Sequence, residues 1–243
     1  MEKKTPIIEM ELYIVRHGQS CGNVKGGYGI PEEELTRDQR VNPPLTELGM
    51  YQAKQLGEYY KDVKFDAVYA SPLRRATMTA YQAIMQNECS EKYIYTMPWL
   101  IECGIEEDYS AVTFDELNAE FEGRILAPEG IDVSGNLVNG DGQNQDSHRR
   151  RAENVISYLK THYHNGEKVM CVAHGGFNTD IFLHAIKAQD TRLFDPAFSN
   201  TGVTKVIVYK ENTGPYGYDI ELCYLNSTAH IVKEKCSVYE WDC

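Results

Sequence analysis

The sequence predicts an α/β fold, a three-layer α/β/α sandwich with a mostly parallel central sheet and helices on both faces. Short apolar runs rich in β-branched residues alternate with segments of helical periodicity, which is typical of such sheets. Two of the apolar runs stop at a His-Gly pair, at His17 and at His174. The length of 243 residues with 42% hydrophobic content is enough for one large core.

Each expected element follows from its own local pattern. Strands are expected where apolar residues run together, at 12–15, 67–70, 93–95, 169–173, 203–209 and 220–224. Helices are expected where apolar residues recur at roughly every third or fourth position, at about 46–60, 73–86, 148–162 and 174–186. Ser71 followed by Pro72 is typical of a helix start, so this pair is expected to cap the second of these helices.

The segment from about residue 104 to 147 differs in character from the rest of the chain. It holds one short helical pattern, at 114–121, and a polar, glycine-rich stretch at 130–142. Long connections of this kind usually carry function or are mobile. We therefore expect a single domain over residues 1–243 with an inserted cap or lid, the alternative being a passive surface excursion.

Composition and charge narrow the classes of partner. The formal charge of −12 argues against nucleic acid or a membrane surface as partner, although a few arginines in a cleft still allow a small anionic substrate. No apolar stretch is long enough for a signal peptide or a membrane span. The 7 cysteines include no Cys-x-x-Cys pair, so we expect neither a zinc site nor a disulfide framework. A cytoplasmic location is expected, and a homodimer stays open.

Residues that follow the expected strands indicate a phosphate site. Arg16 can form paired hydrogen bonds with phosphate oxygens, and Gly18 lets backbone N–H groups approach an anion. Because the carboxyl ends of parallel strands meet at one edge of a sheet, His17 and His174 are expected in one cleft. Arg75 stands in the first turn of a helix, where a bound anion would offset its repulsion by the helix dipole. For either histidine, a structural hydrogen-bonding role is the alternative.

Together these segments resemble the histidine phosphatase superfamily, in particular its phosphoglycerate mutase-like branch, branch 1. The resemblance rests on Arg-His-Gly at 16–18, Ser-x-Leu-x-Arg-Ala at 71–76 and His-Gly at 174–175. Supporting matches, in the family's order, are Ser20, Asn23, Leu45-Thr46-x-x-Gly49, Trp99-x-x-Glu102 and Asn200-Thr201-Gly202-Val203. The matches spread over residues 12–203 and so cover most of the chain.

The resemblance implies catalytic roles. His17 is the nucleophile that takes the phosphoryl group and passes it to water, so its ring must be neutral with one nitrogen free. Arg16, Arg75 and His174 surround the phosphoryl oxygens and stabilise the group during transfer. Their guanidinium and imidazole groups would supply the positive charge, so no metal or other cofactor is expected.

The resemblance also implies an acid and further phosphate contacts. Glu102, in the Trp-x-x-Glu position, protonates the leaving oxygen. Glu106 and Glu107 are competing candidates, with a solvated acidic run as their simpler interpretation. The expected substrate-binding residues are Ser20, Asn23 and Gly175. Short polar residues such as the first two are also common turn formers.

Departures from the family pattern favour a phosphatase. The mutases usually have Glu where this chain has Gln19, and the segment 24–42 lacks their Phe-x-Gly-Trp loop. We expect a metal-independent phosphomonoesterase acting on a small phosphorylated metabolite through a phosphohistidine. A phosphoglycerate mutase primed by 2,3-bisphosphoglycerate and a non-catalytic phosphate-binding module are the alternatives. Arg74 and the basic run 148–151, with Arg149, Arg150 and Arg151, lie either near the pocket or on a solvated helix face.

Overall fold

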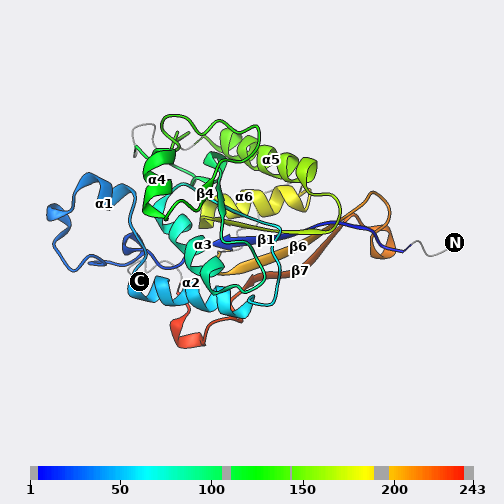
Figure 1. The fold of residues 1–243 in the computed structure, drawn as a ribbon, viewed down its shortest axis with the longest axis horizontal. Coiled ribbons are helices and arrows are strands. Elements are labelled where there is room, and N and C mark those ends of the chain that lie inside the picture. Colours follow the sequence, from blue (N-terminus) through cyan, green and yellow to red (C-terminus); the bar gives the residue numbers. More distant parts are fainter. Residues whose placement is uncertain (1–4, 106–110, 143, 189–196, 238–243) are drawn as a thin grey trace.

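A seven-stranded sheet forms the middle of the molecule in the computed structural model, which describes residues 5–105, 111–142, 144–188 and 197–237 (Figure 1). The strands are β1 (Ile8–Arg16), β2 (Ala67–Ala70), β3 (Ile94–Thr96), β4 (Ile125–Leu126), β5 (Glu167–Ala173), β6 (Val203–Tyr209) and β7 (Ile220–Ser227). Their order is β4-β3-β2-β5-β1-β6-β7. Strands β4 to β1 in this order run parallel, while β6 is antiparallel to both β1 and β7. The predicted mostly parallel sheet is confirmed.

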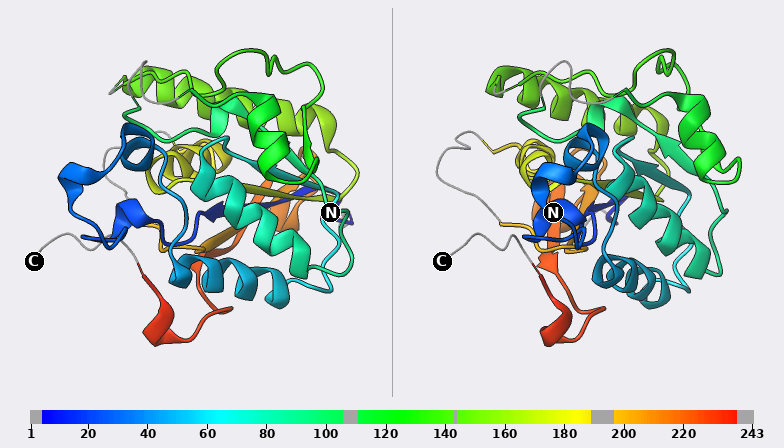
Figure 2. Two further views of the ribbon diagram at one scale, coloured as in Figure 1. Left: turned by 60° about the vertical axis from the view of Figure 1, so that its left-hand side comes forward. Right: turned by 90° about the vertical axis from the view of Figure 1, so that its left-hand side faces the viewer.

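Helices cover both faces of this sheet, which confirms the predicted three layers (Figures 1 and 2). The helices are α1 (Arg37–Val41), α2 (Glu47–Tyr59), α3 (Arg74–Gln86), α4 (Phe114–Glu120), α5 (Gln145–His162) and α6 (Gly175–Ala185). Short 3-10 helices are η1 (Cys21–Asn23), η2 (Glu32–Glu34), η3 (Pro98–Leu100), η4 (Pro215–Gly217) and η5 (Lys233–Lys235). Residues of α2 and α3 pack on one face of the sheet, and residues of α5 and α6 pack on the other.

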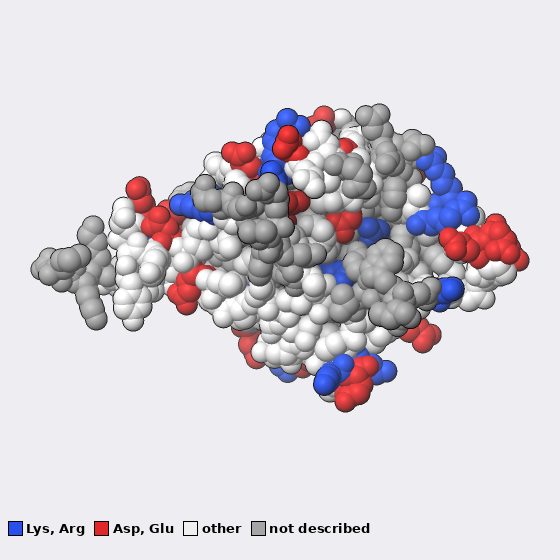
Figure 3. Space-filling view, turned by 180° about the vertical axis from the view of Figure 1, so that it is seen from behind, with Lys and Arg blue, Asp and Glu red and all other residues white. Residues whose placement is uncertain are grey.

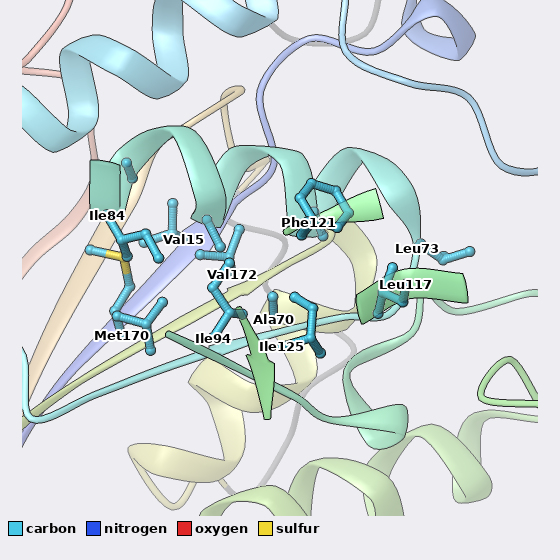
Figure 4. Packing of buried hydrophobic residues seen from close by; sticks show 14 of the residues in the cluster. Val15, Ala70, Leu73, Ile84, Ile94, Leu117, Phe121, Ile125, Met170 and Val172 are labelled. Carbon is cyan, nitrogen blue, oxygen red and sulfur yellow. The ribbon is translucent and has the colours of Figure 1, made fainter. Parts of the chain in front are cut away.

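The side chains of β1 alternate between these two cores, as the period of a strand requires. Val15 is buried in the core below α2 and α3, which Figure 4 shows from close by. Ile14 is buried in the core below α5 and α6. By the same alternation Arg16 is directed toward the α6 side, and the next residue, His17, is directed toward the α3 side. The end of β1 therefore delivers neighbouring side chains to both sides of the sheet.

Backbone hydrogen bonds join the two ends of the expected insert. Gly104 N donates a hydrogen bond to Gly142 O at 2.9 Å, and Gly142 N donates to Ile105 O at 2.7 Å. Between these points lie α4 and β4, and β4 adds an edge strand that is too short for a sequence pattern to predict. Leu117 and Phe121 are buried in the core beside α3 (Figure 4). The insert is thus packed against the sheet, and its role as a lid stays a prediction.

Two helices begin at positions other than those expected. Helix α3 begins at Arg74 and not at the Ser71-Pro72 pair, because the Ser71 hydroxyl lies against a histidine ring described below. Helix α5 begins at Gln145 and not near His148, because the side chain of Asn144 caps its first turn. Both differences come from side-chain hydrogen bonds that the apolar periodicity does not contain.

The end of the described chain folds back onto the body of the protein, near α2 (Figure 2). Gln52 Nε2 donates to Lys235 O at 2.8 Å and to Ser237 Oγ at 2.9 Å. Asn200 N donates to Ser237 O at 2.8 Å. Because Asn200 stands in the Asn-Thr-Gly-Val motif, residues up to 237 support the segment that contacts the end of β1.

The surface shows no continuous basic area on the face drawn in Figure 3, as far as that face is described. The blue Lys and Arg groups at its right and lower edges adjoin red Asp and Glu groups. Among the described helices, none has the length and apolar character needed to cross a membrane.

Candidate active site

His17 follows β1 and is almost fully buried, with 1% of its surface exposed. Its Nδ1 lies 2.7 Å from Gly18 O, and since a carbonyl only accepts, Nδ1 carries the proton and Nε2 keeps its lone pair. Arg75 Nε donates a hydrogen bond to that Nε2 across 3.2 Å. Burial lowers the pKa of His17 well below its ordinary value, and the charges of Arg75 and Arg16 lower it further. The ring is therefore neutral near pH 7.

Three neighbouring strands end beside this ring. Strands β2, β5 and β1 are adjacent in the sheet and are followed by Ser71, His174 and His17. His17 N donates to Ala173 O at 2.9 Å, which continues the β1–β5 pairing past the strand end. The ring centroids of His17 and His174 lie 5.2 Å apart. The structure thus brings the two strand-end histidines into one place.

Ser71 orients the second histidine. Its Oγ lies 2.9 Å from His174 Nε2, and both residues are fully buried. Burial, the charge of Arg75 and the nearby His17 lower the pKa of His174 well below its ordinary value. Both imidazoles are therefore neutral, as expected for His17, whereas His174 was expected to share the positive charge with the guanidinium groups. Ser71 was expected only as a helix cap, although its place in the Ser-x-Leu-x-Arg-Ala motif was a signal for a role at the site.

Two arginines enter the site from opposite faces of the sheet. Arg16 is fully buried and its Nη1 donates to Phe198 O at 2.5 Å. A Cβ on Gly175 would lie only 3.4 Å from Arg16 Nε, so the glycine permits this close approach. Arg75 Nη1 and His174 Nδ1 are buried and have no hydrogen-bond partner among the described residues. Since buried polar atoms are normally paired, these two can serve an anion such as phosphate.

Ser20 and Asn23 form the turn that follows His17. Ser20 N and Ser20 Oγ both donate to Asn23 Oδ1, at 3.0 and 3.1 Å. Asn200 Nδ2 donates to the same oxygen at 3.3 Å and to His17 O at 3.1 Å. These contacts are those of turn formers, and they hold the His17 main chain in place. Their role as phosphate contacts stays a prediction.

The Leu-Thr-x-x-Gly motif packs against the same loop. A Cβ on Gly49 would lie 2.0 Å from Gln19 O, so only glycine allows α2 to approach this closely. Thr46 Oγ1 accepts a hydrogen bond from Gly49 N at 3.0 Å, which caps α2. The same hydroxyl lies 2.8 Å from Gln19 Oε1, to which it donates. Gln19, the residue that differs from the mutase pattern, is therefore bound to α2.

Glu102 follows η3 and its carboxylate lies at the N-terminus of α6. Oε1 accepts hydrogen bonds from Cys103 N and Phe177 N, both at 2.9 Å. Oε2 lies 3.4 Å from Gly176 N, a weaker contact. Helix α6 begins directly after His174, so Glu102 and His174 are held at the same helix end. The competing candidates Glu106 and Glu107 lie outside the described residues.

Arg151 holds the Glu102 segment in place. Its guanidinium donates to both carboxylate oxygens of Asp141, at 2.8 and 3.2 Å. It also donates to the carbonyl oxygens of Trp99 at 2.9 Å and Ile101 at 2.8 Å. Its Cζ lies 4.3 Å from the centroid of the Phe177 ring, a cation–π contact with α6. One side chain thus joins the insert, the Trp-x-x-Glu segment and α6.

The residues of the basic run 148–151 lie on two different faces of α5. His148 and Arg151 are buried, while Arg149 and Arg150 are exposed. The spacing of the buried pair matches that of Ala152 and Val155 on the core face, which was the signal available in the sequence. The expected position on a solvated helix face therefore holds for Arg149 and Arg150 and not for His148 and Arg151.

Arg74 lies away from the histidines. Its Nε donates to Glu120 Oε1 at 2.6 Å, an ion pair between α3 and α4. Of the two arginines that open α3, one therefore contacts the insert and the other, Arg75, contacts His17.

Comparisons with known proteins identify the family of the chain. A family model described as histidine phosphatase superfamily (branch 1) matches residues 12–215. Over 150 residues the chain is 29% identical to fructose-2,6-bisphosphatase TIGAR of Xenopus tropicalis, covering 61% of this chain and 49% of that protein, so it spans about half of that relative. It is 29% identical over 167 residues to adenosylcobalamin/alpha-ribazole phosphatase of Salmonella typhi, covering 69% and 75% of the two chains.

Solved structures show the same fold. The phosphoserine phosphatase of Entamoeba histolytica, solved as a mutant in complex with phosphoserine, superimposes with a TM-score of 0.56 at 21% sequence identity. The superposition covers 92% of this chain and 100% of that one. At this identity the likeness concerns the fold alone.

Proposed function

The chain belongs to the histidine phosphatase superfamily, and we propose that it is a phosphomonoesterase that acts through a phosphohistidine on His17. One observation carries the proposal. His17 is neutral, its Nδ1–H is fixed on Gly18 O, and its Nε2 lone pair lies against a buried guanidinium. A neutral imidazole with one free nitrogen beside a cation is what attack on a phosphate ester needs.

In the first step, His17 Nε2 attacks phosphorus and the bond from phosphorus to the ester oxygen breaks. Glu102 donates a proton to that leaving oxygen, so the alcohol leaves uncharged. Arg75, already within reach of His17, and the buried Arg16 stabilise the charge on the phosphoryl oxygens. The product of this step is phosphohistidine with an ionised Glu102.

In the second step, water attacks the phosphohistidine and the bond between phosphorus and Nε2 breaks. Glu102 accepts a proton from the attacking water, and inorganic phosphate leaves. His17 returns to its neutral form. The two guanidinium groups supply the positive charge in both steps, so the proposal requires no metal ion at phosphorus.

A cavity of about 580 Å³ adjoins the turn after His17 and is a candidate for the rest of the substrate. Asn23 lies in its wall together with the apolar side chains of Tyr28, Ile30 and Leu35 and the cations Lys25 and Arg40. This volume suits a metabolite-sized ligand. The names of the related proteins suggest substrates to try first: fructose 2,6-bisphosphate, phosphoserine and alpha-ribazole phosphate.

The test is phosphate release from a panel of phosphorylated metabolites headed by these three. We expect continuous release by the purified chain and a loss of more than about 1000-fold in His17→Ala, as for other catalytic nucleophiles. The exposed His164→Ala is the matched control. Acid-sensitive, base-stable labelling of the wild type by a phosphate-labelled substrate would identify phosphohistidine. Full hydrolysis by His17→Ala would contradict the proposal, and net isomerisation of phosphoglycerate without phosphate release would show a mutase.

A further inference from the structure

Three side chains of types that can bind a metal ion meet beside Glu102, and none of the three is assigned a role in phosphoryl transfer. The ligand atoms of Cys103, His148 and Asp180 all lie within 4.8 Å of one another. We propose that these three residues form a binding site for Zn²⁺. The proposal is independent of the proposed phosphatase activity, because none of the three touches phosphorus in that mechanism.

The three side-chain types favour Zn²⁺ over other divalent cations. Thiolate, imidazole and carboxylate are the ligands that Zn²⁺ takes in proteins, whereas Mg²⁺ and Ca²⁺ require oxygen ligands throughout. With three protein ligands, water would complete a four-coordinate site. The absence of a Cys-x-x-Cys pair does not bear on this site, because its ligands come from three separate segments of the chain.

The distances suit a tetrahedral ion after a small contraction. Bonds of about 2.0–2.3 Å to zinc place neighbouring ligand atoms about 3.5 Å apart. Cys103 Sγ and Asp180 Oδ2 already lie at 3.5 Å. Cys103 follows η3 at the edge of the insert, and Asp180 projects from α6, whose helix packs against α5. Rotation of the partly buried Cys103 and Asp180 side chains would supply the remaining contraction.

His148 has the tautomer that a metal ligand needs. Its Nε2 lies 2.9 Å from Gly142 O and 3.2 Å from Asp141 Oδ1, so Nε2 carries the proton. Nδ1 is therefore the nitrogen with a lone pair. A histidine ligand typically donates its other N–H to a carbonyl or carboxylate, and both kinds of acceptor are present here.

The surrounding charges favour a divalent cation. Asp141, which supports His148, is neutralised by its two hydrogen bonds to Arg151. The Cys103 thiol donates to Asp180 Oδ2. Zn²⁺ binding would release the thiol proton to solvent, and the resulting thiolate and the Asp180 carboxylate would carry the two negative charges that balance the ion. Arg149 is exposed, where solvent and salt screen its charge. A bound ion would join the Glu102 segment, α5 and α6, and so add stability to the side of the site that holds the proposed acid.

The experiment is metal titration of the full chain after treatment with a chelator. We expect one Co²⁺ per chain with a thiolate-to-cobalt charge-transfer band, which one equivalent of Zn²⁺ removes. Cys103→Ser should abolish the band and weaken Zn²⁺ binding by more than about 100-fold, since supporting residues alone change metal affinity by 10–100-fold. Zn²⁺ should raise the Tm of the wild type and leave that of Cys103→Ser unchanged.

Controls separate this site from adventitious thiol binding. Cys89→Ser and Cys223→Ser remove exposed thiols and should bind Zn²⁺ as the wild type does. Asp180→Asn keeps the size of the side chain and tests the site independently if Cys103→Ser does not fold; it too should weaken binding. The proposal is overturned if no stoichiometric binding occurs, or if the exposed-cysteine variants lose binding while Asp180→Asn retains it.

Discussion

Arg75 Nε donates a hydrogen bond to His17 Nε2 across 3.2 Å, so the atom proposed to attack phosphorus is held by a group proposed to bind phosphate. The same guanidinium helps to lower the pKa of both His17 and His174, after burial itself. The cation keeps the nucleophile unprotonated before substrate arrives. A phosphate ester would then replace the imidazole as the hydrogen-bond partner of Arg75, which frees the lone pair for attack.

Replacing Arg75 by glutamine should change the pH dependence of the enzyme as well as its rate. Loss of the positive charge raises the pKa of His17, so the acidic limb of kcat/KM against pH should move to higher pH. At neutral pH, kcat/KM should fall by about 10³-fold, the lower range for loss of a phosphate-stabilising arginine. Arg74→Gln, in the neighbouring position but paired with Glu120, is the control. An acidic limb that does not move would contradict the electrostatic role of Arg75.

Glu102→Gln should slow hydrolysis according to the leaving group. An alkyl phosphate needs a proton on its departing oxygen, so kcat/KM should fall by about 10²–10⁴-fold. An aryl phosphate with an acidic phenol, such as 4-nitrophenyl phosphate, should lose far less because its leaving group departs as an anion. Glu153→Gln changes an exposed glutamate of α5 and serves as the control. Equal losses on both substrates would assign Glu102 a structural role at the start of α6.

The strand ends of this site could be predicted because their signal is local. The apolar runs before His17 and His174 predict buried parallel strands, and adjacent parallel strands end at one edge. Ser71 also follows an expected strand, but it was assigned to the cap of the next helix and not to the site. Its contact with His174 depends on β2 and β5 being neighbours, and the order of strands is not written in any single segment.

The support for Glu102 was only partly visible in local sequence patterns. Arg151 stands in a run of basic residues, and composition alone does not distinguish it from the exposed Arg150. Only the phase of α5 separates the two, and that phase is set by the packing of α5 on α6. The Arg151–Asp141 pair also requires the two ends of the insert to lie side by side, and this depends on the tertiary fold.

The Arg151–Asp141 pair should contribute strongly to stability because it is largely buried. Arg151→Met removes the cationic partner of a largely buried carboxylate and should lower the free energy of unfolding by about 3 kcal/mol, as breaking buried ion pairs does. Asp141→Asn should also destabilise, and the double variant should lose less than the sum of the two. Urea unfolding of the three variants measures this coupling. Arg150→Met should change stability by about 0.5 kcal/mol or less. Strict additivity would show that the two residues act separately.

The burial of His230, which is not among the proposed catalytic residues, predicts that the free energy of unfolding depends on pH. It is 8% exposed and its Nε2 lies 2.9 Å from Thr201 Oγ1, next to the main chain that contacts the end of β1. Burial lowers the pKa of His230 from 6.5 to about 4. Between these values the unfolded chain binds a proton that the folded protein does not bind, so stability falls as pH falls.

From pH 7 to pH 5 this histidine should therefore remove about 2 kcal/mol of stability. In His230→Gln, urea unfolding at the two pH values should show a loss smaller by that amount, whatever the stability of the variant at pH 7. His17 and His174, whose lowered pKa values act in the same direction, are present in both proteins and cancel in the comparison. The exposed His164→Gln should lose as much as the wild type. Equal losses in His230→Gln and wild type would show that His230 is protonated alike in the folded and unfolded chain.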